Sequence, residues 1–381
     1  MNIKFLYLDD EEKERINSLL RELNNRELGL EVVFRNPKEY SEQVDELVNE
    51  LVHSNFHGLI LDWRLDLLPV LDGRVVGYRA SSIAQEIRTR ASEKNILEVP
   101  IVLLSASDKL RQSYDRDESS HDLFDKIYIK EAVAENARQI SIELIALEKG
   151  YRTISYARNK KYPLYKILNL EKKYTDILDL RLQEIFLEEE LKPTHKYAQF
   201  ILKEMIEVPG PLIDEFILAA RLGIDIEKSK DWEKLKVNAL DSFSYKGPFG
   251  EAWCRWWSTL LEKWWESLKG YSEPLPFLNA SERVEIIKEN TNYRNLFPAK
   301  VIEKGYSSKF WTICQVRNKP LDPVDGFMIQ SKENYPWQER LYVSKIAALN
   351  REQRPKGLKV HPFDRESLRN YIEEMDSQTH G

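Results

Sequence analysis

The stretch Ile3-Lys4-Phe5-Leu6-Tyr7-Leu8-Asp9-Asp10 has the pattern that decides the fold of the first part of the chain. A short apolar run with high β propensity stops at two carboxylates, and a helical pattern follows over residues 11–24. Further strands are predicted at residues 30–34, 57–61, 99–104 and 126–129, and further helices at 40–53, 81–90 and 131–149. Strands that alternate with helices predict an α/β fold with a five-stranded, doubly wound parallel sheet.

Polar side chains stand where the predicted strands end. Asp9 and Asp10 follow the first strand, Asp62 the third, Ser105 the fourth and Lys130 the fifth. Because the ligand site of such a sheet lies at the carboxyl ends of its strands, we expect these side chains to share a pocket. Three carboxylates without a cation repel each other, and Mg²⁺ resolves that conflict. A carboxylate beside Mg²⁺ can attack a phosphoryl group, while a hydroxyl and an ammonium neutralise the transferred oxygens.

The motifs LDDEE, LDW, LSA and IK at successive strand ends resemble the receiver domain of two-component response regulators. The resemblance covers residues 1–149 and implies a flavodoxin-like receiver that takes a phosphoryl group from a histidine kinase. It implies that Asp62 is the phosphoacceptor and that Asp9, Asp10 and Asp62 hold Mg²⁺. Ser105 corresponds to the family's switch hydroxyl, and Lys130 to its invariant lysine.

The sequence departs from the family pattern around the site. The residue two beyond the acceptor, which in the family lends a backbone carbonyl to the metal, is Arg64, and its side chain is expected to slow hydrolysis of the acyl phosphate. The loop after the acceptor is longer than usual before the turn at Asp72. The proline that usually follows the lysine is replaced by Glu131. Ile127 stands at the switch-aromatic position, and strand alternation points the neighbouring Tyr128 to the opposite face.

Each motif also has a structural explanation when it is taken alone. Acidic residues are favoured at helix starts, as Asp9 and Asp10 would be. A serine at a strand end can be a cap, and a single lysine usually lies on the surface. A pseudo-receiver that keeps the fold without the phosphoryl chemistry is therefore an alternative to a working receiver.

Charge and composition predict two parts with different tasks in this chain of 381 residues and net charge −6. Residues 1–150 hold 20 Lys and Arg against 29 Asp and Glu, whereas the rest holds 37 against 34. We expect a receiver at 1–149 and a mostly helical output or interaction region at 150–381, with a possible sub-boundary near 271–280. Two cysteines exclude a disulfide framework, and the absence of a long apolar run or secretory signal predicts a cytoplasmic protein without a membrane span.

The second part has no recognisable catalytic motif, so its output cannot be assigned from a pattern. Helices are predicted at 168–191, 196–206, 211–222, 232–240, 250–269, 280–289 and 365–375, while 310–316 and 340–349 are ambiguous between strand and helix. An effector enzyme with an unrecognised active site is therefore an alternative to an interaction region, and enzymatic activity beyond the receiver's own phosphotransfer is not expected.

Two features of the second part are candidate interaction surfaces. Arg158, Lys160 and Lys161 lie among tyrosines, a pattern that can bind nucleic acid or can belong to a hinge that packs on an acidic face. Overall acidity and the absence of a helix-turn-helix argue against nucleic acid. Five of the nine tryptophans lie within residues 253–265, where Trp253, Trp257 and Trp264 share one face of the predicted helix. That face is expected in a core first and at a partner surface second.

The interpretation is a phospho-receiver that signals through protein–protein contacts with a downstream effector protein or a second copy of the chain. The arrangement of a receiver before a large region that does not bind DNA is similar to the receiver proteins of two-component-like bacterial anti-phage defence systems of the Detocs type. That similarity concerns architecture and not motifs.

Overall fold

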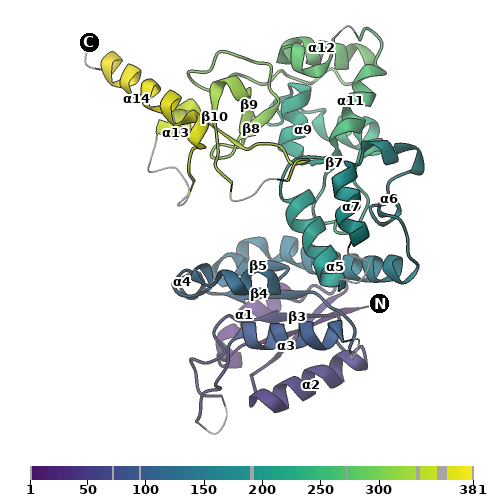
Figure 1. Cartoon of the computed structure of the whole chain (residues 1–381), viewed down its shortest axis with the longest axis vertical. Coiled ribbons are helices and arrows are strands. Elements are labelled where there is room, and N and C mark those ends of the chain that lie inside the picture. Colours follow the sequence, from purple (N-terminus) through teal and green to yellow (C-terminus); the bar gives the residue numbers. More distant parts are fainter. Residues whose placement is uncertain are drawn as a thin grey trace. The chain divides into compact units, whose positions relative to one another are not determined.

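The computed structural model describes residues 2–70, 73–93, 96–188, 193–271, 273–331, 335–349 and 358–379 (Figure 1). These residues form two compact units. The first unit comprises Met1–Lys203 and Lys246–Trp253, and the second comprises Glu204–Tyr245 and Cys254–Gly381. Within the described part of the chain, no helix has the length and apolar character needed to cross a membrane.

The first unit contains the predicted sheet. Its five strands lie in the order β2-β1-β3-β4-β5, and all their pairings are parallel. The strands are β1 (Ile3–Leu8), β2 (Leu30–Arg35), β3 (Gly58–Leu61), β4 (Ile101–Ser105) and β5 (Lys126–Ile129). Every residue of β3 and β4 is buried, as expected of central strands covered on both faces. The prediction of a doubly wound α/β fold is confirmed.

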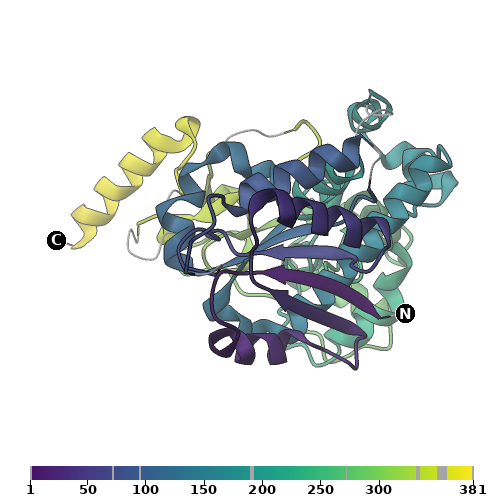
Figure 2. The ribbon, with the colours of Figure 1, turned by 90° about the horizontal axis from the view of Figure 1, so that it is seen from below.

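Helices cover both faces of this sheet (Figure 2). On one face α1 packs against α5, and on the other α2 packs against α3. These helices and the short α4 have the bounds α1 (Lys13–Leu23), α2 (Tyr40–Val52), α3 (Ala80–Ser92), α4 (Ser107–Gln112) and α5 (Val133–Asn159). The predicted helices match α1, α2 and α3 closely, whereas α4 was not predicted.

The helix α5 continues well beyond the boundary expected at residue 149. Its second half keeps an apolar face, since Tyr151, Ile154 and Ala157 are buried. The first unit then continues through α6 (Leu164–Ile167), α7 (Leu180–Glu188) and α8 (Thr194–Gln199), and α8 runs on into a π-helical segment, Phe200–Ile206. The single helix predicted over 168–191 is wrong, because a turn and a 3₁₀ segment (Lys172–Ile177) precede α7; residues 189–191 lie outside the described residues.

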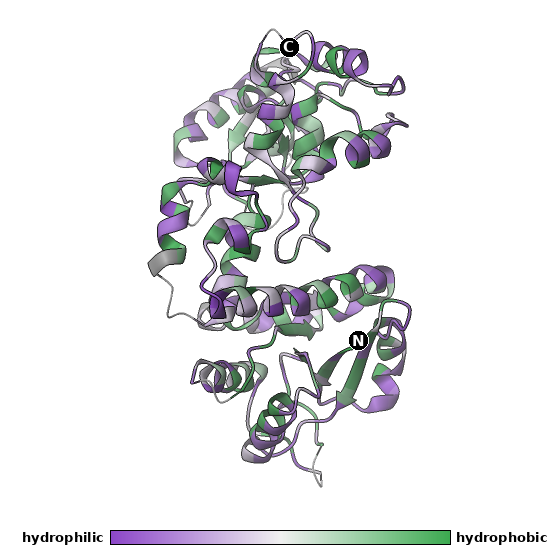
Figure 3. Cartoon of the chain, turned by 90° about the vertical axis from the view of Figure 1, so that its right-hand side faces the viewer, coloured by the Kyte–Doolittle hydropathy of each residue, from purple (hydrophilic) through white to green (hydrophobic). Residues whose placement is uncertain are grey.

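The second unit is mostly helical but includes a small sheet. Its helices are α9 (Glu215–Leu222), α10 (Trp232–Leu235), α11 (Ser258–Glu266), α12 (Ala280–Asn290), α13 (Lys345–Leu349) and α14 (Arg365–Thr379). Its strands are β6 (Leu212–Ile213), β7 (Trp256–Trp257), β8 (Thr312–Cys314), β9 (Lys319–Leu321), β10 (Gly326–Met328) and β11 (Tyr342–Ser344). The last four form a sheet in the order β10-β11-β8-β9. In Figure 3 the strands of the first unit are drawn mostly in green, the colour of hydrophobic residues.

One predicted helix of the second unit is wrong over its first half. The helix expected at residues 250–269 begins only at Ser258, and the two residues before it form β7, which pairs antiparallel with β6. The cause is non-local, because Trp257 pairs with Leu212 and Trp256 with Ile213. Helical spacing of apolar residues alone could not reveal that pairing.

Candidate functional site

Three carboxylates converge at the carboxyl edge of the five-stranded sheet. Asp9 and Asp10 follow β1, and Asp62 follows β3, whose residues pair in parallel register with those of β1. Their carboxylate oxygens lie within 4.8 Å of one another. Asp9 and Asp62 are fully buried, and Asp10 is 2% exposed. The predicted acidic cluster therefore exists, and its three carboxylates are buried.

Lys130 joins the carboxylates as predicted, and Ser105 ends β4, the strand that lies between those of Asp62 and Lys130. Ser105 is the last residue of β4 and is fully buried, and Lys130 directly follows β5. The ammonium of Lys130 lies 2.6 Å from Asp9 Oδ2 and 3.3 Å from Asp62 Oδ1. Burial alone would lower the pKa of Lys130, but the charges of Asp62 and Asp9 outweigh burial and raise it. The lysine is therefore a permanent cation of this site. We call Asp9, Asp10, Asp62, Ser105 and Lys130 the acidic site.

The donor atoms of the acidic site fit a metal ion. Asp10 Oδ1, Asp62 Oδ1 and Ser105 Oγ are buried without a hydrogen-bond partner, although Asp62 Oδ1 has its ion pair with Lys130. Burial raises the pKa of Asp10, against the opposing effect of two backbone N–H groups. Buried carboxylate oxygens without partners are costly, and hard divalent cations prefer such oxygens as ligands. The cluster could therefore hold a metal ion through these carboxylates.

The sequence analysis missed a second lysine at the acceptor. Lys109 on α4 places its ammonium 2.9 Å from Asp62 Oδ2, with 16% of its side chain exposed. Thus each oxygen of Asp62 faces one lysine. The sequence contains only a weak signal for this contact. Lys109 follows Ser105 by four residues, and its side chain reaches the acidic site only if a helix begins directly after the strand that ends at Ser105.

Arg64 does not supply the cation that the sequence analysis expected near the acceptor. Its backbone N–H donates to Asp62 Oδ2 at 3.2 Å, but its guanidinium binds Asp66 at 2.6 Å and 3.2 Å. The guanidinium is therefore paired with Asp66, and Lys109 is a cation that contacts Asp62.

The extended loop after Asp62 folds onto the acidic site. The backbone N–H groups of Leu67 and Leu68 donate to Asp10 Oδ2 at 2.9 Å and 2.7 Å. The loop therefore binds one oxygen of this carboxylate and leaves the other without a partner. The expected turn residue Asp72 lies outside the described residues.

The residues that depart from the receiver pattern make other contacts. Ile127 is 41% exposed, while Tyr128 is buried and donates its hydroxyl to Glu143 at 2.9 Å. The two side chains thus differ as strand alternation predicted. Glu131, at the usual proline position, accepts hydrogen bonds from the backbone N–H of Ser107 at 3.2 Å, at the start of α4.

In the basic segment at the end of α5, the contacts of Arg158 support the interpretation that this segment packs within the protein. Arg158 donates to the Thr194 hydroxyl at 3.1 Å and lies 4.7 Å above the Tyr197 ring. It also lies 3.9 Å from the carboxylate of Glu98, before β4. Lys160 and Lys161 are exposed, so the structure does not bring the three residues to a common contact.

The tryptophans proposed for an interaction surface lie in different surroundings. Trp257 is 2% exposed and packs edge-on against Tyr245. Trp264 packs against Phe243 with ring centres 6.0 Å apart. Trp253 belongs to the first unit, where the ammonium of Lys126 lies 5.5 Å from its ring. They do not form one stripe, because the helix that would align them is interrupted by β7.

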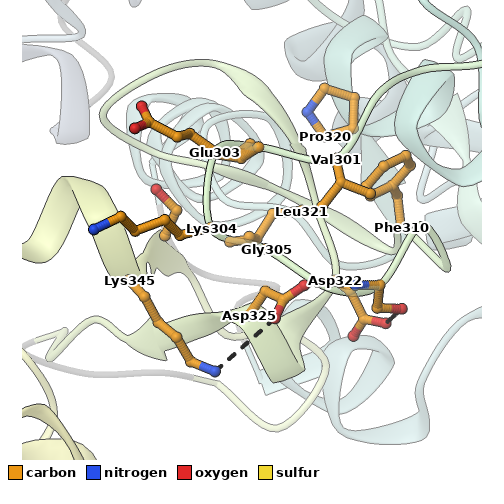
Figure 4. Close-up of a pocket in the computed structure, with 13 residues that line it drawn as sticks. Val301, Glu303, Lys304, Gly305, Phe310, Pro320, Leu321, Asp322, Asp325 and Lys345 are labelled. Carbon is orange, nitrogen blue, oxygen red and sulfur yellow. Dashed lines mark hydrogen bonds and ion pairs between the residues drawn. The ribbon is translucent and has the colours of Figure 1, made fainter. Parts of the chain in front are cut away.

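A small cavity in the second unit bears on the alternative of an effector enzyme (Figure 4). Asp325 is buried there and accepts hydrogen bonds from the backbone N–H groups of Tyr306 at 2.7 Å and Ser307 at 2.8 Å. Asp322 accepts the Ser307 hydroxyl, and Lys345 lies 3.9 Å from Asp325. These acids hold neighbouring loops together, and their contacts favour a structural role for this cavity.

Comparisons with known proteins leave the family open. The sequence matches no family model, and no curated protein is similar to it. Among solved structures, a sensor protein from Polaromonas sp. JS666 is similar over 39% of this chain and 98% of its own length, with 12% identity and a TM-score of 0.26. A match at this TM-score carries no argument about the present chain.

Proposed function

We propose that the first unit is a phosphoacceptor that takes a phosphoryl group from the phosphohistidine of a histidine kinase onto Asp62. The observation that supports this proposal is the acidic site itself. Three carboxylates and one ammonium from three strand ends meet in one buried cluster, and Ser105 ends the strand between those of Asp62 and Lys130. Asp10 Oδ1 and Ser105 Oγ are buried there without a hydrogen-bond partner, and a metal ion or a phosphoryl group would supply one.

The transfer is a substitution at phosphorus. One oxygen of Asp62 forms a bond to phosphorus, the P–N bond of phosphohistidine breaks, and the imidazole nitrogen keeps the electron pair. Lys130 lies beside the acceptor, and its ammonium and the buried Ser105 hydroxyl, which has no hydrogen-bond partner, would bind the oxygens of the transferred group. Asp9, Asp10, Asp62 and the backbone carbonyl of Arg64 would hold Mg²⁺, which neutralises phosphoryl oxygens when it is bound.

The acyl phosphate carries close to two negative charges in place of the single charge of the Asp62 carboxylate, so the sheet edge becomes more negative by about one charge. We propose that this change alters protein–protein contacts of the second region with a downstream effector protein or a second copy of the chain. A role in bacterial phage defence follows only from the architectural similarity given above.

A silent receiver that works as a scaffold is the second candidate. The observation that favours it is the closed acceptor, because Asp62 is fully buried and a lysine faces each of its oxygens. Such a chain would take up no phosphoryl group from any donor.

The test is phosphoryl uptake from a small acyl-phosphate donor, with and without Mg²⁺. The parent should gain about 80 Da, the mass of one phosphoryl group, and only with Mg²⁺. Asp62→Asn should gain nothing, whereas Asp108→Asn, which changes an exposed carboxylate on α4, should behave as the parent. Absence of uptake in the parent, repeated with candidate kinases, would favour the scaffold.

A further inference from the structure

Lys109 is the feature of the acidic site that the receiver resemblance does not explain. Its ammonium binds Asp62 Oδ2 at 2.9 Å, and Lys130 faces Oδ1 at 3.3 Å. An oxygen engaged by an ammonium is a poorer nucleophile, and it is also less available to a metal ion. The pair therefore closes the acceptor in the state that the structure describes.

The Lys109 side chain is also one of the contacts that join α4 to the acceptor strand. Ser113, at the end of α4, donates its hydroxyl to the backbone carbonyl of Lys109 at 3.1 Å and accepts the indole N–H of Trp63. Trp63 follows Asp62 directly and is fully buried. The position of this six-residue helix is thus tied to the acceptor strand through the Lys109 side chain and through Trp63.

We propose that Lys109 is a gating residue that holds Asp62 closed at rest and couples the state of this carboxylate to the position of α4. The proposal rests on the proposed function, since the gate opens for phosphoryl transfer. When the acceptor is used, the ion pair between Lys109 and Asp62 Oδ2 breaks and no covalent bond of Lys109 changes. The helix then loses one of its ties to the sheet edge and becomes free to shift.

This coupling does not use the switch-aromatic position of the receiver family. The switch-aromatic position holds the exposed Ile127, and the neighbouring Tyr128 is engaged by Glu143. No aromatic side chain therefore stands at the switch-aromatic position to respond to a change at Ser105. Lys109 instead contacts the acceptor directly and belongs to α4 itself.

The charges of the site predict the direction of the effect. Lys130 lies within ion-pair distance of Asp9, Glu11 and Asp62, and Lys109 lies within ion-pair distance of Asp62. Removal of the Lys109 charge makes the site more negative and leaves Asp62 Oδ2 with the backbone N–H of Arg64 but without an ammonium. A divalent cation should then bind more tightly, because a neighbouring cation no longer opposes it.

The test compares Lys109→Met with two other variants. Lys109→Arg keeps the charge. Arg111→Met removes a cation from the same helix, and this arginine contacts the backbone carbonyl of Ser107 instead of the acidic site. The first measurement is calorimetric titration with Mg²⁺ alone, and the second is hydrogen exchange of the α4 amides without Mg²⁺. Lys109→Met should bind Mg²⁺ about 3- to 10-fold more tightly and should exchange its α4 amides about 5-fold faster than the parent. Lys109→Arg and Arg111→Met should stay close to the parent in both.

The results separate this proposal from the proposed function. If Lys109→Met keeps the parent's Mg²⁺ affinity and α4 exchange, the gate is refuted even where the parent takes up a phosphoryl group. If Lys109→Met changes both quantities while the parent takes up no phosphoryl group, the coupling of Asp62 to α4 stands and the proposed function fails. If Lys109→Met does not fold, α4 exchange in Lys109→Gln decides, with the same two outcomes.

Discussion

Replacement of Glu98 by glutamine should destabilise the first unit in a pH-dependent way. Glu98 lies just before β4, and its carboxylate accepts hydrogen bonds from the backbone N–H groups of Thr194 at 2.7 Å and His195 at 2.9 Å. The His195 ring contacts the same carboxylate at 3.2 Å. These bonds hold the start of α8 against the edge of the sheet opposite the acidic site.

The magnitude follows from the pKa of Glu98. Burial alone would raise this pKa, but the hydrogen bonds from His195 and from the backbone N–H of Thr194 outweigh burial and lower the pKa from 4.5 to about 2. At about 1.4 kcal/mol for each tenfold change in a dissociation constant, the folded state gains on the order of 3 kcal/mol at neutral pH. Because the folded-state pKa is the lower one, this gain is complete above pH 4.5 and is lost as the pH falls toward 2. Burial lowers the pKa of His195, so its neutral ring donates from Nδ1 to Glu98 at pH 7.

Urea denaturation, followed by circular dichroism at pH 7 and near pH 3, measures the effect. Glu98→Gln should lower the free energy of unfolding by about 2–3 kcal/mol at pH 7 and by less than half of that near pH 3. The control is Glu22→Gln, which changes an exposed carboxylate on α1 and should have little effect. An equal loss at both pH values, or a loss at pH 7 no larger than that of the control, would refute the reasoning.

Three further predictions concern packing, metal binding and the second unit. Gly150→Ala on α5 should lower the free energy of unfolding of the first unit by about 1–3 kcal/mol, because a Cβ there would lie 2.1 Å from the Phe249 ring. In a Phe249→Ala background the same change should be neutral or stabilising. Thermal melting of the parent, the two single variants and the double variant checks this. Mg²⁺ should raise the melting temperature of the parent and should bind Asp10→Asn at least about 10-fold more weakly by calorimetry, since a carboxylate ligand is lost. Arg221→Met should cost about 3 kcal/mol, because Arg221 is fully buried and binds the Ser258 hydroxyl at 2.6 Å and the Glu339 carboxylate; denaturation measures the loss, and phosphoryl uptake should not change.

The acidic site could be predicted because its information is local. Each strand is a short apolar run, and each functional residue follows such a run directly. The parallel sheet then brings Asp9, Asp62 and Lys130 together without any knowledge of side-chain packing. Alternation along β5 likewise distinguished Ile127 from Tyr128.

The contacts that could not be predicted depend on short elements and distant pairings. The helix α4 has six residues and buries only Leu110, too little for a periodic pattern, so Lys109 was missed. The strands β8 to β11 have three residues each, which hides the period of two. The pairing of the Arg64 guanidinium with Asp66 was not predicted, because both residues lie in a loop without a periodic pattern.

The most direct test of the central claim is to locate the phosphoryl group on the chain. Hydroxylamine converts an acyl phosphate into a hydroxamate and releases phosphate, so the acceptor keeps a mass label after treatment. The parent, incubated with Mg²⁺ and a small acyl-phosphate donor and then treated with hydroxylamine, should show this label at Asp62 in peptide mass spectrometry. A label at another carboxylate, or none after confirmed uptake, would contradict the assignment of Asp62 as the phosphoacceptor.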